Sequence, residues 1–310
     1  MILNIDFNPT VDRNYILDKV YLGKANNTKT FSCNPGGKGF VSSVLLDAFN
    51  ESSFITGFLG GINGEYFHRR LSEMKIAHEF IPIREETRTI IRLKDAENYT
   101  TISEEGPRVT REEVVAFYEL YSKLIEKNNI ICGFGSILPQ GVPKDIYFDL
   151  IELANKRGKK FILNVGVDEL SHGIDATPYM VILKQRELED LLRISLHFEN
   201  EIIKAGKYLL DRGVEFVVID LQDKGSLVLG QEKGYRVEIP YLGDHITNLG
   251  YNSMSAGFAL GINRNYDIEM AIRLGQAFNI VSNFESDIMK IEVSDIKRFM
   301  SQIEIYPINY

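Results

Sequence analysis

The sequence predicts an α/β fold in which a doubly wound, mostly parallel sheet is flanked by helices. From Thr110 onward, Val- and Ile-rich runs of strand length alternate with amphipathic helical segments, the pattern of a parallel sheet covered on both faces. The length of 310 residues is enough to bury a full α/β core. In the first half, two pairs of more exposed strands interrupt this pattern, and we expect them to lie outside the main core.

The first half opens with a buried strand. The apolar run MILNIDF is ended by the turn signal Asn8-Pro9. Loose alternation over 11–31 predicts a hairpin outside the core, and GEYFHRRLSEM predicts an amphipathic helix with Phe67 and Leu71 on one face. The other elements expected here are a helix after NPGGKGF that includes Val44, Leu45 and Phe49, a strand over 54–61, and a strand pair over 86–95 and 98–103.

The second half alternates regularly. We expect helices over 111–127, 143–158, 199–213, 252–262, 268–283 and 293–301, and strands over 129–136, 160–166, 179–184, 214–221, 225–230 and 235–240. The last two strands are close enough in sequence to form a hairpin. Ligands of such sheets bind at the carboxyl ends of the strands, so the loops there should carry the chemistry.

Composition excludes several classes of function. The net charge of -8 argues against nucleic-acid or anionic-membrane partners, because both require basic patches that displace counterions. An anionic small substrate stays open, because a local Lys/Arg site can lie on an acidic protein. Cys33, Cys132 and the five histidines lack disulfide or metal-ligand spacing, so no metal site is expected. No apolar run reaches membrane-spanning length, and the first strand begins at Ile2 without a basic leader, which favours a cytoplasmic protein.

The glycine cluster NPGGKG at 34–39 is the first candidate for chemistry. It offers backbone N–H groups without obstructing side chains, and a lysine beside them, which suits a sugar or a phosphate. A glycine turn that merely joins a strand to a helix is the alternative. The spacing of a Walker A loop is absent.

A combination of motifs is more specific than this cluster alone. NPTVD at 8–12, NPGGKG at 34–39, TGFLGG with G-x-x-F at 56–67, ETR at 86–88 and SMSAGF at 253–258 follow one another along the chain. In this order and spacing the chain resembles the PfkB carbohydrate kinases of the ribokinase-like superfamily, in the branch of 1-phosphofructokinase and tagatose-6-phosphate kinase. The resemblance covers nearly the whole sequence.

The resemblance implies an architecture and a set of ligands. A single ribokinase-like domain would span 1–310, with a small β-sheet lid whose strands are inserted at about 11–33 and 86–103. ATP and Mg²⁺ would be the cofactors, and a sugar phosphate the small-molecule partner. An exposed lid sheet also favours a homodimer contact between two such sheets.

Site residues follow from the resemblance position by position. Asp12 matches the aspartate that hydrogen-bonds sugar hydroxyls, and Arg88 the arginine that helps to hold the substrate phosphate, a task suited to a planar bidentate donor. A turn residue after Pro9 and a solvated lid charge are the structural alternatives for these two. Gly36, Gly37, Lys38 and Gly39 match the sugar-contacting glycine motif. The positions matched to nucleotide contacts are Lys184, Gln222, Gly225, Ser253, Asn279 and Ser282.

The catalytic motif departs from the family. Family kinases carry G-A-G-D before S-M-x-A-G-F, with the Asp as base and the amides at the helix start holding the phosphoryl group. Here the four residues are Leu249, Gly250, Tyr251 and Asn252. Asn252 has no carboxylate to accept a proton, so a general-base contribution of roughly 10²–10⁴-fold should be lost. Tyr251 places a ring where a glycine would let the backbone approach the phosphate.

Other departures gather at nucleotide and sugar contacts. In this chain Val41 stands where the family has an Asn, and Asn164 stands where the family has a strand-end Asp. Three longer family elements are also replaced: K-P-N by Lys184-Gln185-Arg186, S-L-G by Asp220-Leu221-Gln222, and T-E-G-T-G by FESDI from Phe284. We therefore expect that catalysis is relaxed more than the fold.

Three functions stay open on the sequence alone. The first is an ATP-dependent sugar-phosphate kinase with impaired catalysis, in which Asn252 only positions the acceptor hydroxyl. The second is an inactive family member that binds a sugar phosphate or a nucleotide as a sensor or partner protein. The third is an α/β protein that uses the same cleft for an unrelated small ligand.

Overall fold

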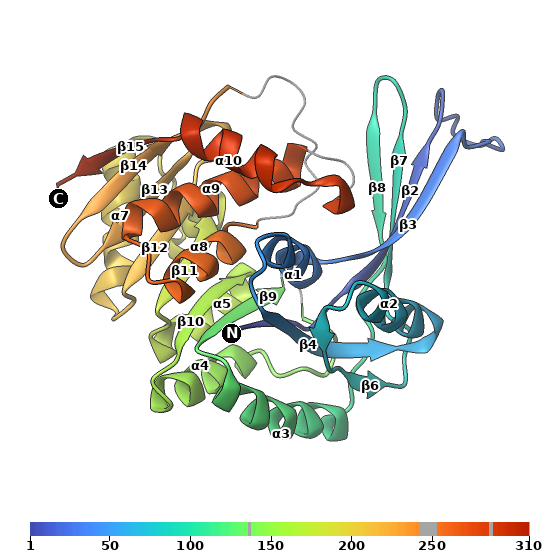
Figure 1. The fold of residues 1–310 in the computed structure, drawn as a ribbon, viewed down its shortest axis with the longest axis horizontal. Coiled ribbons are helices and arrows are strands. Elements are labelled where there is room, and N and C mark those ends of the chain that lie inside the picture. Colours follow the sequence, from blue (N-terminus) through green and yellow to red (C-terminus); the bar gives the residue numbers. More distant parts are fainter. Residues whose placement is uncertain (136–137, 242–252, 285–287, 310) are drawn as a thin grey trace.

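A large mixed sheet runs through the protein and carries helices on both faces (Figure 1). The computed structural model describes residues 1–135, 138–241, 253–284 and 288–309. In spatial order its parallel strands are β5 (Ala77–His78), β4 (Ser53–Gly60), β1 (Ile2–Asp6), β9 (Ile130–Gly135), β10 (Lys160–Val165), β11 (Met180–Lys184) and β12 (Phe216–Asp220), and β6 (Ile81–Ile83) also pairs with β4. The predicted doubly wound sheet is confirmed.

Strand β1 lies between β4 and β9, and all five of its residues are buried. Asp6, its last residue, is in register with Gly57 of β4 and Phe134 of β9. The polar end of the apolar run MILNIDF therefore falls near the middle of the carboxyl edge of the sheet.

Three antiparallel strands extend the sheet at its other edge. They are β13 (Ser226–Gly230), β14 (Gly234–Glu238) and β15 (Glu304–Ile308). The first two form the predicted hairpin. The third was not predicted; it contains Pro307 and pairs with β14, which places it at the edge where a proline is tolerated.

Helices form one layer on each face. One layer contains α3 (Arg111–Lys127), α4 (Ile146–Lys156), α5 (Val167–Gly173), α6 (Gln185–Leu192) and α7 (Glu199–Asp211). The other contains α1 (Lys38–Ala48), α2 (Gly61–Glu73), α8 (Met254–Asn263), α9 (Ile268–Phe284) and α10 (Val293–Gln302). Short 3₁₀ turns are η1 (Ile174–Ala176), η2 (Gln222–Lys224) and η4 (Ile288–Lys290). Helices α5 and α6 and the short strands β5 and β6 were not predicted.

A second, four-stranded sheet projects beside the main body (Figure 1). Its order is β3 (Thr30–Gly36), β2 (Thr10–Ile16), β7 (Thr89–Lys94) and β8 (Tyr99–Ser103). Strand β2 pairs antiparallel with β3 and parallel with β7. The sequence predicted that both strands of the pair β7–β8 would be exposed. Strand β8 is exposed throughout, but Thr89 and Arg92 of β7 are buried.

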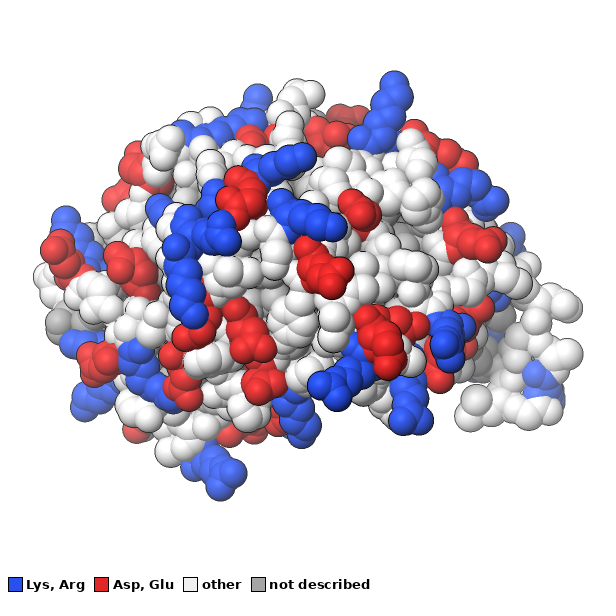
Figure 2. Space-filling model, turned by 90° about the horizontal axis from the view of Figure 1, so that it is seen from below, with Lys and Arg blue, Asp and Glu red and all other residues white. Residues whose placement is uncertain are grey.

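One face of the protein mixes both signs of charge. Figure 2 shows Lys and Arg side chains interspersed with Asp and Glu over the face seen from below. Among the residues with a described structure, none of the helices combines the length and apolarity needed to cross a bilayer.

Helices α8 and α9 cross closely because glycines line the contact. A Cβ atom on Gly257 of α8 would lie 2.4 Å from the backbone carbonyl atoms of Leu274 in α9. One on Gly261 would lie 2.7 Å from the Cβ atom of Ala271. The backbone of α9 therefore sets the position of α8, whose first turn faces the carboxyl edge of the sheet.

We expect Gly257→Ala to lower the free energy of unfolding by about 3 kcal/mol, because the added methyl group meets backbone that cannot rotate away. Gly206→Ala in α7 is the matched control. Its methyl group would meet the side-chain ends of Leu229 and Ile219, which can move, and helix propensity favours alanine by about 1 kcal/mol. Urea denaturation followed by circular dichroism checks both variants; equal losses would contradict this account of the α8–α9 contact.

Candidate active site

Polar side chains from four parallel strands meet at the carboxyl edge of the main sheet. They are Asp6 of β1, Asn164 of β10, Lys184 of β11 and Asp220 of β12. Lys184 and Asp220 are register partners on neighbouring strands. This is the edge at which an open α/β sheet binds its ligands.

Asp6 holds the start of helix α1 in place. Its carboxylate accepts hydrogen bonds from the backbone N–H groups of Gly39, at 2.9 Å, and Asn8, at 3.2 Å. Gly37, the N-cap of α1, has a φ of 102°, and a Cβ atom there would lie 2.7 Å from Asp6 Oδ2. Glycine is therefore required at position 37, both for the backbone conformation and for the close approach of the carboxylate.

The charge of Asp6 is set by opposing effects. Burial raises the pKa of the Asp6 carboxyl above its ordinary value, and the two backbone hydrogen bonds lower it. The positive charges of Arg88 and Lys38 lower it further. Asp6 was not predicted as a site residue, because a polar residue at the end of a buried strand is common. Its only local signal was its place before Asn8-Pro9.

Asp12 lies within strand β2 and not in a turn. Its Oδ2 atom accepts a hydrogen bond of 2.5 Å from Arg92 Nη1 of β7, and the two side chains are 4% and 6% exposed. Thr10 Oγ1 donates to Asp12 Oδ1 at 2.7 Å, and a Cβ atom on Gly36 would lie 2.4 Å from the Asp12 carboxyl carbon. The sequence analysis did not single out Arg92, which is 80 positions away along the chain.

Arg88 lies between the two aspartates and the edge of the second sheet. Its Nη1 atom donates to Ser103 Oγ at 3.2 Å and to the backbone carbonyl of Glu104 at 3.4 Å. The Nε–H group is buried and has no hydrogen-bond acceptor among the described residues. Burial lowers the pKa of Arg88, and the charges of Asp6 and Asp12 act against that shift. A half-buried guanidinium with an N–H group that lacks an acceptor among the described residues can donate a hydrogen bond to an anion.

Lys38 connects the glycine motif to helix α8 through a hydrogen-bonded chain. Its Nζ atom donates to Asn164 Oδ1 at 3.0 Å, and Asn164 Nδ2 donates to Ser255 Oγ at 3.1 Å. Burial lowers the pKa of the Lys38 ammonium, and Glu187 and Asp6 raise it. An amine in this state gains from the arrival of an anion, because an added negative charge stabilises its protonated form.

Lys184 and Gln222 line a hollow of about 280 Å³ beside this chain, together with Asp220 and Arg186. Burial raises the pKa of Asp220, and its Oδ1 atom accepts the Gln222 N–H group at 2.9 Å. Gly225 lies in the turn after η2 with a φ of 86°, and a Cβ atom there would lie 2.0 Å from the Val237 carbonyl oxygen. The turn geometry alone accounts for this glycine.

The remaining predicted nucleotide contacts lie on α8 and α9. Ser253 is the N-cap of α8, and its buried Oγ atom has no hydrogen-bond partner within the described part of the chain. Ser282 Oγ donates to the Asn279 carbonyl at 3.1 Å, and Asn283 Nδ2 donates to Asn279 Oδ1 at 3.2 Å. These bonds are internal to α9, so no described contact joins Asn279 or Ser282 to the hollow at Lys184.

The predicted catalytic residues Gly250, Tyr251 and Asn252 lie outside the described residues, as does part of the FESDI segment. The structure does bring Asp12, Gly36, Gly37, Lys38 and Arg88 together around Asp6. Within the described ranges, no three His, Cys, Asp or Glu side chains gather as ligands for a metal ion.

Comparison with known proteins gives relatives over the full length. The chain is 28% identical to the 1-phosphofructokinase of Bacillus subtilis (strain 168), covering 93% of this chain and 94% of the relative. It is also 28% identical to a tagatose-6-phosphate kinase of Staphylococcus epidermidis, covering 98% and 99%. Among solved structures, phosphofructokinase-2 from Escherichia coli in complex with potassium superposes with a TM-score of 0.88 at 19% identity, covering 97% of this chain and 98% of the other.

The family match covers the region in which the site lies. The pattern that describes the pfkB family of carbohydrate kinases matches residues 2–281, which include every predicted site residue except Ser282. The fold agrees, since the whole-chain superposition on E. coli phosphofructokinase-2 includes both the large sheet and the small sheet of this protein within the 97% covered. The chain therefore belongs to the pfkB family of carbohydrate kinases.

Proposed function

We propose that the protein is an ATP-dependent sugar-phosphate kinase of the phosphofructokinase and tagatose-6-phosphate kinase type, with impaired catalysis. One observation carries the proposal: Lys38 lies between the Asp6–Asp12–Arg88 cluster and the hollow at Lys184, so an acceptor site and a donor site adjoin. The relatives named 1-phosphofructokinase and tagatose-6-phosphate kinase support the substrate class.

The sugar phosphate is assigned to the cluster around Asp6. Asp12, fixed by its ion pair with Arg92, accepts hydrogen bonds from sugar hydroxyl groups, and the exposed backbone at Gly37 contacts the same sugar. Arg88 and Lys38 hold the phosphate, Arg88 through its free Nε–H group and Lys38 through its ammonium. The second sheet, which carries Asp12 and borders Arg88, then acts as a lid over the sugar.

ATP is assigned to the hollow lined by Lys184, Gln222 and Asp220. Lys184 neutralises phosphate charge there, and Ser253 presents a free hydroxyl group at the start of α8. Mg²⁺ is held in such sites through one or two carboxylates and the phosphate oxygens, and not by an all-protein cage. Asp220 and Glu189 are the carboxylates that line the hollow, and we assign this role to Asp220, at the end of β12.

The chemical step is expected to be slow. Gly250 and the amides before Ser253 would cradle the γ-phosphoryl group, and Asn252 would position the acceptor hydroxyl without taking its proton. Positioning and electrostatics supply most of the catalysis of phosphoryl transfer, so turnover persists at a reduced rate. An inactive sensor with the same binding site is the second candidate, and it is favoured by the pair Tyr251 and Asn252.

A second copy of the chain is the proposed protein partner, in the cytoplasm. The small sheet exposes apolar side chains that a partner sheet would cover: Ile16, Phe31 and Ile102, which are 46%, 51% and 52% exposed. Strand β8, at one edge of this sheet, leaves its outer backbone groups available for pairing. An inhibited form of E. coli phosphofructokinase-2, which has the same fold, is a tetramer.

The double variant Tyr251→Gly, Asn252→Asp should raise kcat by roughly 10²-fold to 10⁴-fold, because it restores the general base and the space beside the phosphoryl group. Purified wild type and variant would be assayed with Mg-ATP and a panel of fructose and tagatose phosphates. Calorimetry of both proteins with the same sugars shows whether binding is equal, so that the change lies in the chemical step.

Three results would contradict this assignment. Wild-type turnover at about 1–100 per second, the usual range of kinases, would show that Asn252 does not limit the reaction. Sugar-phosphate binding with no turnover by either protein would replace the kinase with the sensor. Absence of ATP binding to both proteins would exclude the kinase as well.

We expect the protein to take up protons when it binds a sugar phosphate at about pH 9. A phosphate monoester is already fully dianionic at this pH, so the ligand itself exchanges no proton. Burial lowers the pKa of Lys38 below the ordinary 10.5, so part of the amine is neutral in the free protein, and the phosphate returns the proton to it. Affinity should therefore fall as the pH rises toward 10.5. Calorimetry in two buffers of different ionisation enthalpy measures the uptake.

Lys38→Arg is the control, because its guanidinium stays protonated throughout this range. We expect it to bind the sugar phosphate without proton uptake. Wild-type binding that is independent of pH and of the buffer would mean that Lys38 does not face the phosphate.

A further inference from the structure

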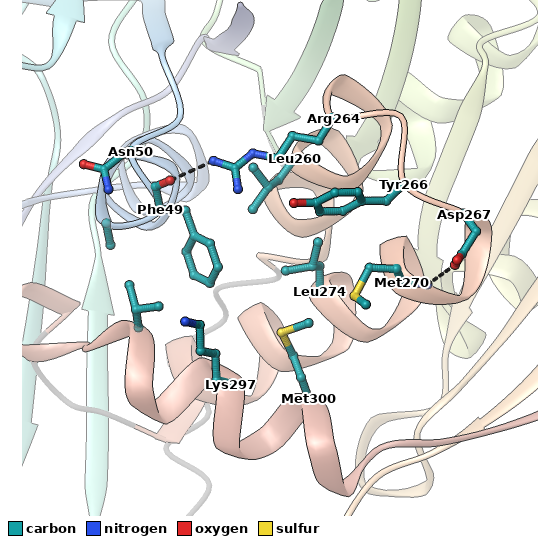
Figure 3. A pocket seen from close by; sticks show the side chains of 12 residues that line it. Phe49, Asn50, Leu260, Arg264, Tyr266, Asp267, Met270, Leu274, Lys297 and Met300 are labelled. Atoms are coloured by element: carbon teal, nitrogen blue, oxygen red, sulfur yellow. Dashed lines mark hydrogen bonds between the residues drawn. The ribbon is translucent and has the colours of Figure 1, made fainter.

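A second cavity lies where helices α1 and α8 end, away from their first turns at the candidate active site. It has a volume of about 650 Å³, and its wall comes from the end of α1, helices α8 and α9 with the loop between them, and helix α10 (Figure 3). This volume is in the range of sites for small organic ligands, roughly 300–1,000 Å³. The 11 residues of α1 and the 10 of α8 separate it from the candidate active site by about 15 Å of helix.

The wall of this cavity is mainly apolar and partly exposed. Phe49, Leu260, Leu274 and Met300 point into it from three sides (Figure 3). Met270, on the same wall, is 38% exposed, and Tyr266 at the rim is 45% exposed. Large apolar side chains gathered in a concave and exposed site indicate a ligand with an apolar body, and methionines adapt to its shape.

One cation of the wall is already neutralised within the protein. Arg264 Nε donates to Glu51 Oε2 at 2.8 Å, and Arg264 Nη2 donates to the Phe49 carbonyl at 2.8 Å. Asn263 Nδ2 donates to the other carboxylate oxygen of Glu51 at 2.7 Å. Glu51 thus fastens the end of α8 to the segment that follows α1 and forms a stable rim.

The other cation of the wall, Lys297, has no such partner. No hydrogen bond or ion pair joins its ammonium to another residue in the described ranges, and Figure 3 shows it directed into the cavity. The acidic residue of the wall, Asp267, lies on the opposite side and accepts the Met270 N–H group at 2.8 Å. The cavity therefore offers apolar walls and one exposed ammonium that no acidic residue of the described ranges pairs.

We propose that this cavity binds a small amphipathic carboxylate whose aliphatic chain lies against the apolar wall and whose acid group pairs with Lys297. A monoanion matches the one ammonium of Lys297, which is exposed to solvent, while its aliphatic chain covers the apolar wall. The site lies at the far ends of α1 and α8, so its ligand does not compete with a sugar phosphate. The proposal is independent of kinase activity.

Decanoate is the probe, and fluorescence is the measurement. The chain contains no tryptophan, so Tyr266→Trp introduces a single indole at the rim of the cavity. Decanoate, kept below the concentration at which it forms micelles, should change the emission of this variant in a saturable way. Tyr208→Trp, at a 49% exposed position of α7 on the opposite face of the main sheet, is the matched reporter and should not respond.

Charge and location are tested in the same Tyr266→Trp protein. Lys297→Met keeps the aliphatic stem and should weaken decanoate binding about twofold to fivefold, with decanol binding unchanged. Lys123→Met on α3 should change neither affinity. Calorimetry of the wild-type protein, which has no tryptophan, should give the same affinity for decanoate as the fluorescence of the Tyr266→Trp variant. The proposal is overturned by equal responses of both reporters, by decanoate binding that is insensitive to Lys297→Met, or by displacement of decanoate by fructose 6-phosphate or ATP.

Discussion

The arrangement of the candidate active site depends on the buried carboxylate of Asp6. It ends a strand near the middle of the main sheet and accepts the N–H groups of Gly39 and Asn8, so the start of α1 and the turn before β2 are fixed to the same atom group. Keeping a charge there opposes burial, which raises its pKa. The hydrogen bonds and the nearby Arg88 and Lys38 offset part of that cost, and the same two cations are the ones available to a substrate phosphate.

From Asp6 the site extends in two directions. Toward the small sheet, the Asp12–Arg92 ion pair ties strand β2 to β7, so the proposed lid and the proposed sugar-binding carboxylate are one unit. Toward the nucleotide side, the chain from Lys38 through Asn164 to Ser255 reaches the first turn of α8. Displacement of α8, whose position is set by its glycine contact with α9, would therefore reach Lys38 through two hydrogen bonds.

The local pattern of apolar residues predicted much of the fold, but it did not predict the edge strand of the main sheet or the side-chain pairs between residues distant in sequence. Buried Val/Ile runs and amphipathic helices predicted the parallel strands and most helices, because each pattern reports which face is buried. Strand β15 is an edge strand with a proline and an irregular burial pattern, so no local signal marks it. Asp12 and Arg88 were predicted through motifs, but Arg92 and Asp6 act through partners distant in sequence, which one unaligned chain does not reveal. The predicted roles of Gly250, Tyr251 and Asn252 stay predictions, since these residues lie outside the described ranges.

The central claim is that a sugar phosphate binds in the cluster around Asp6. A crystal structure of the protein with fructose 6-phosphate tests it most directly. The account predicts sugar hydroxyl groups on Asp12 and Gly37, and phosphate oxygens within hydrogen-bond distance of Arg88 Nε and Lys38 Nζ. A sugar phosphate bound in the hollow at Lys184, or one that leaves Arg88 and Asp12 without contacts, would contradict it.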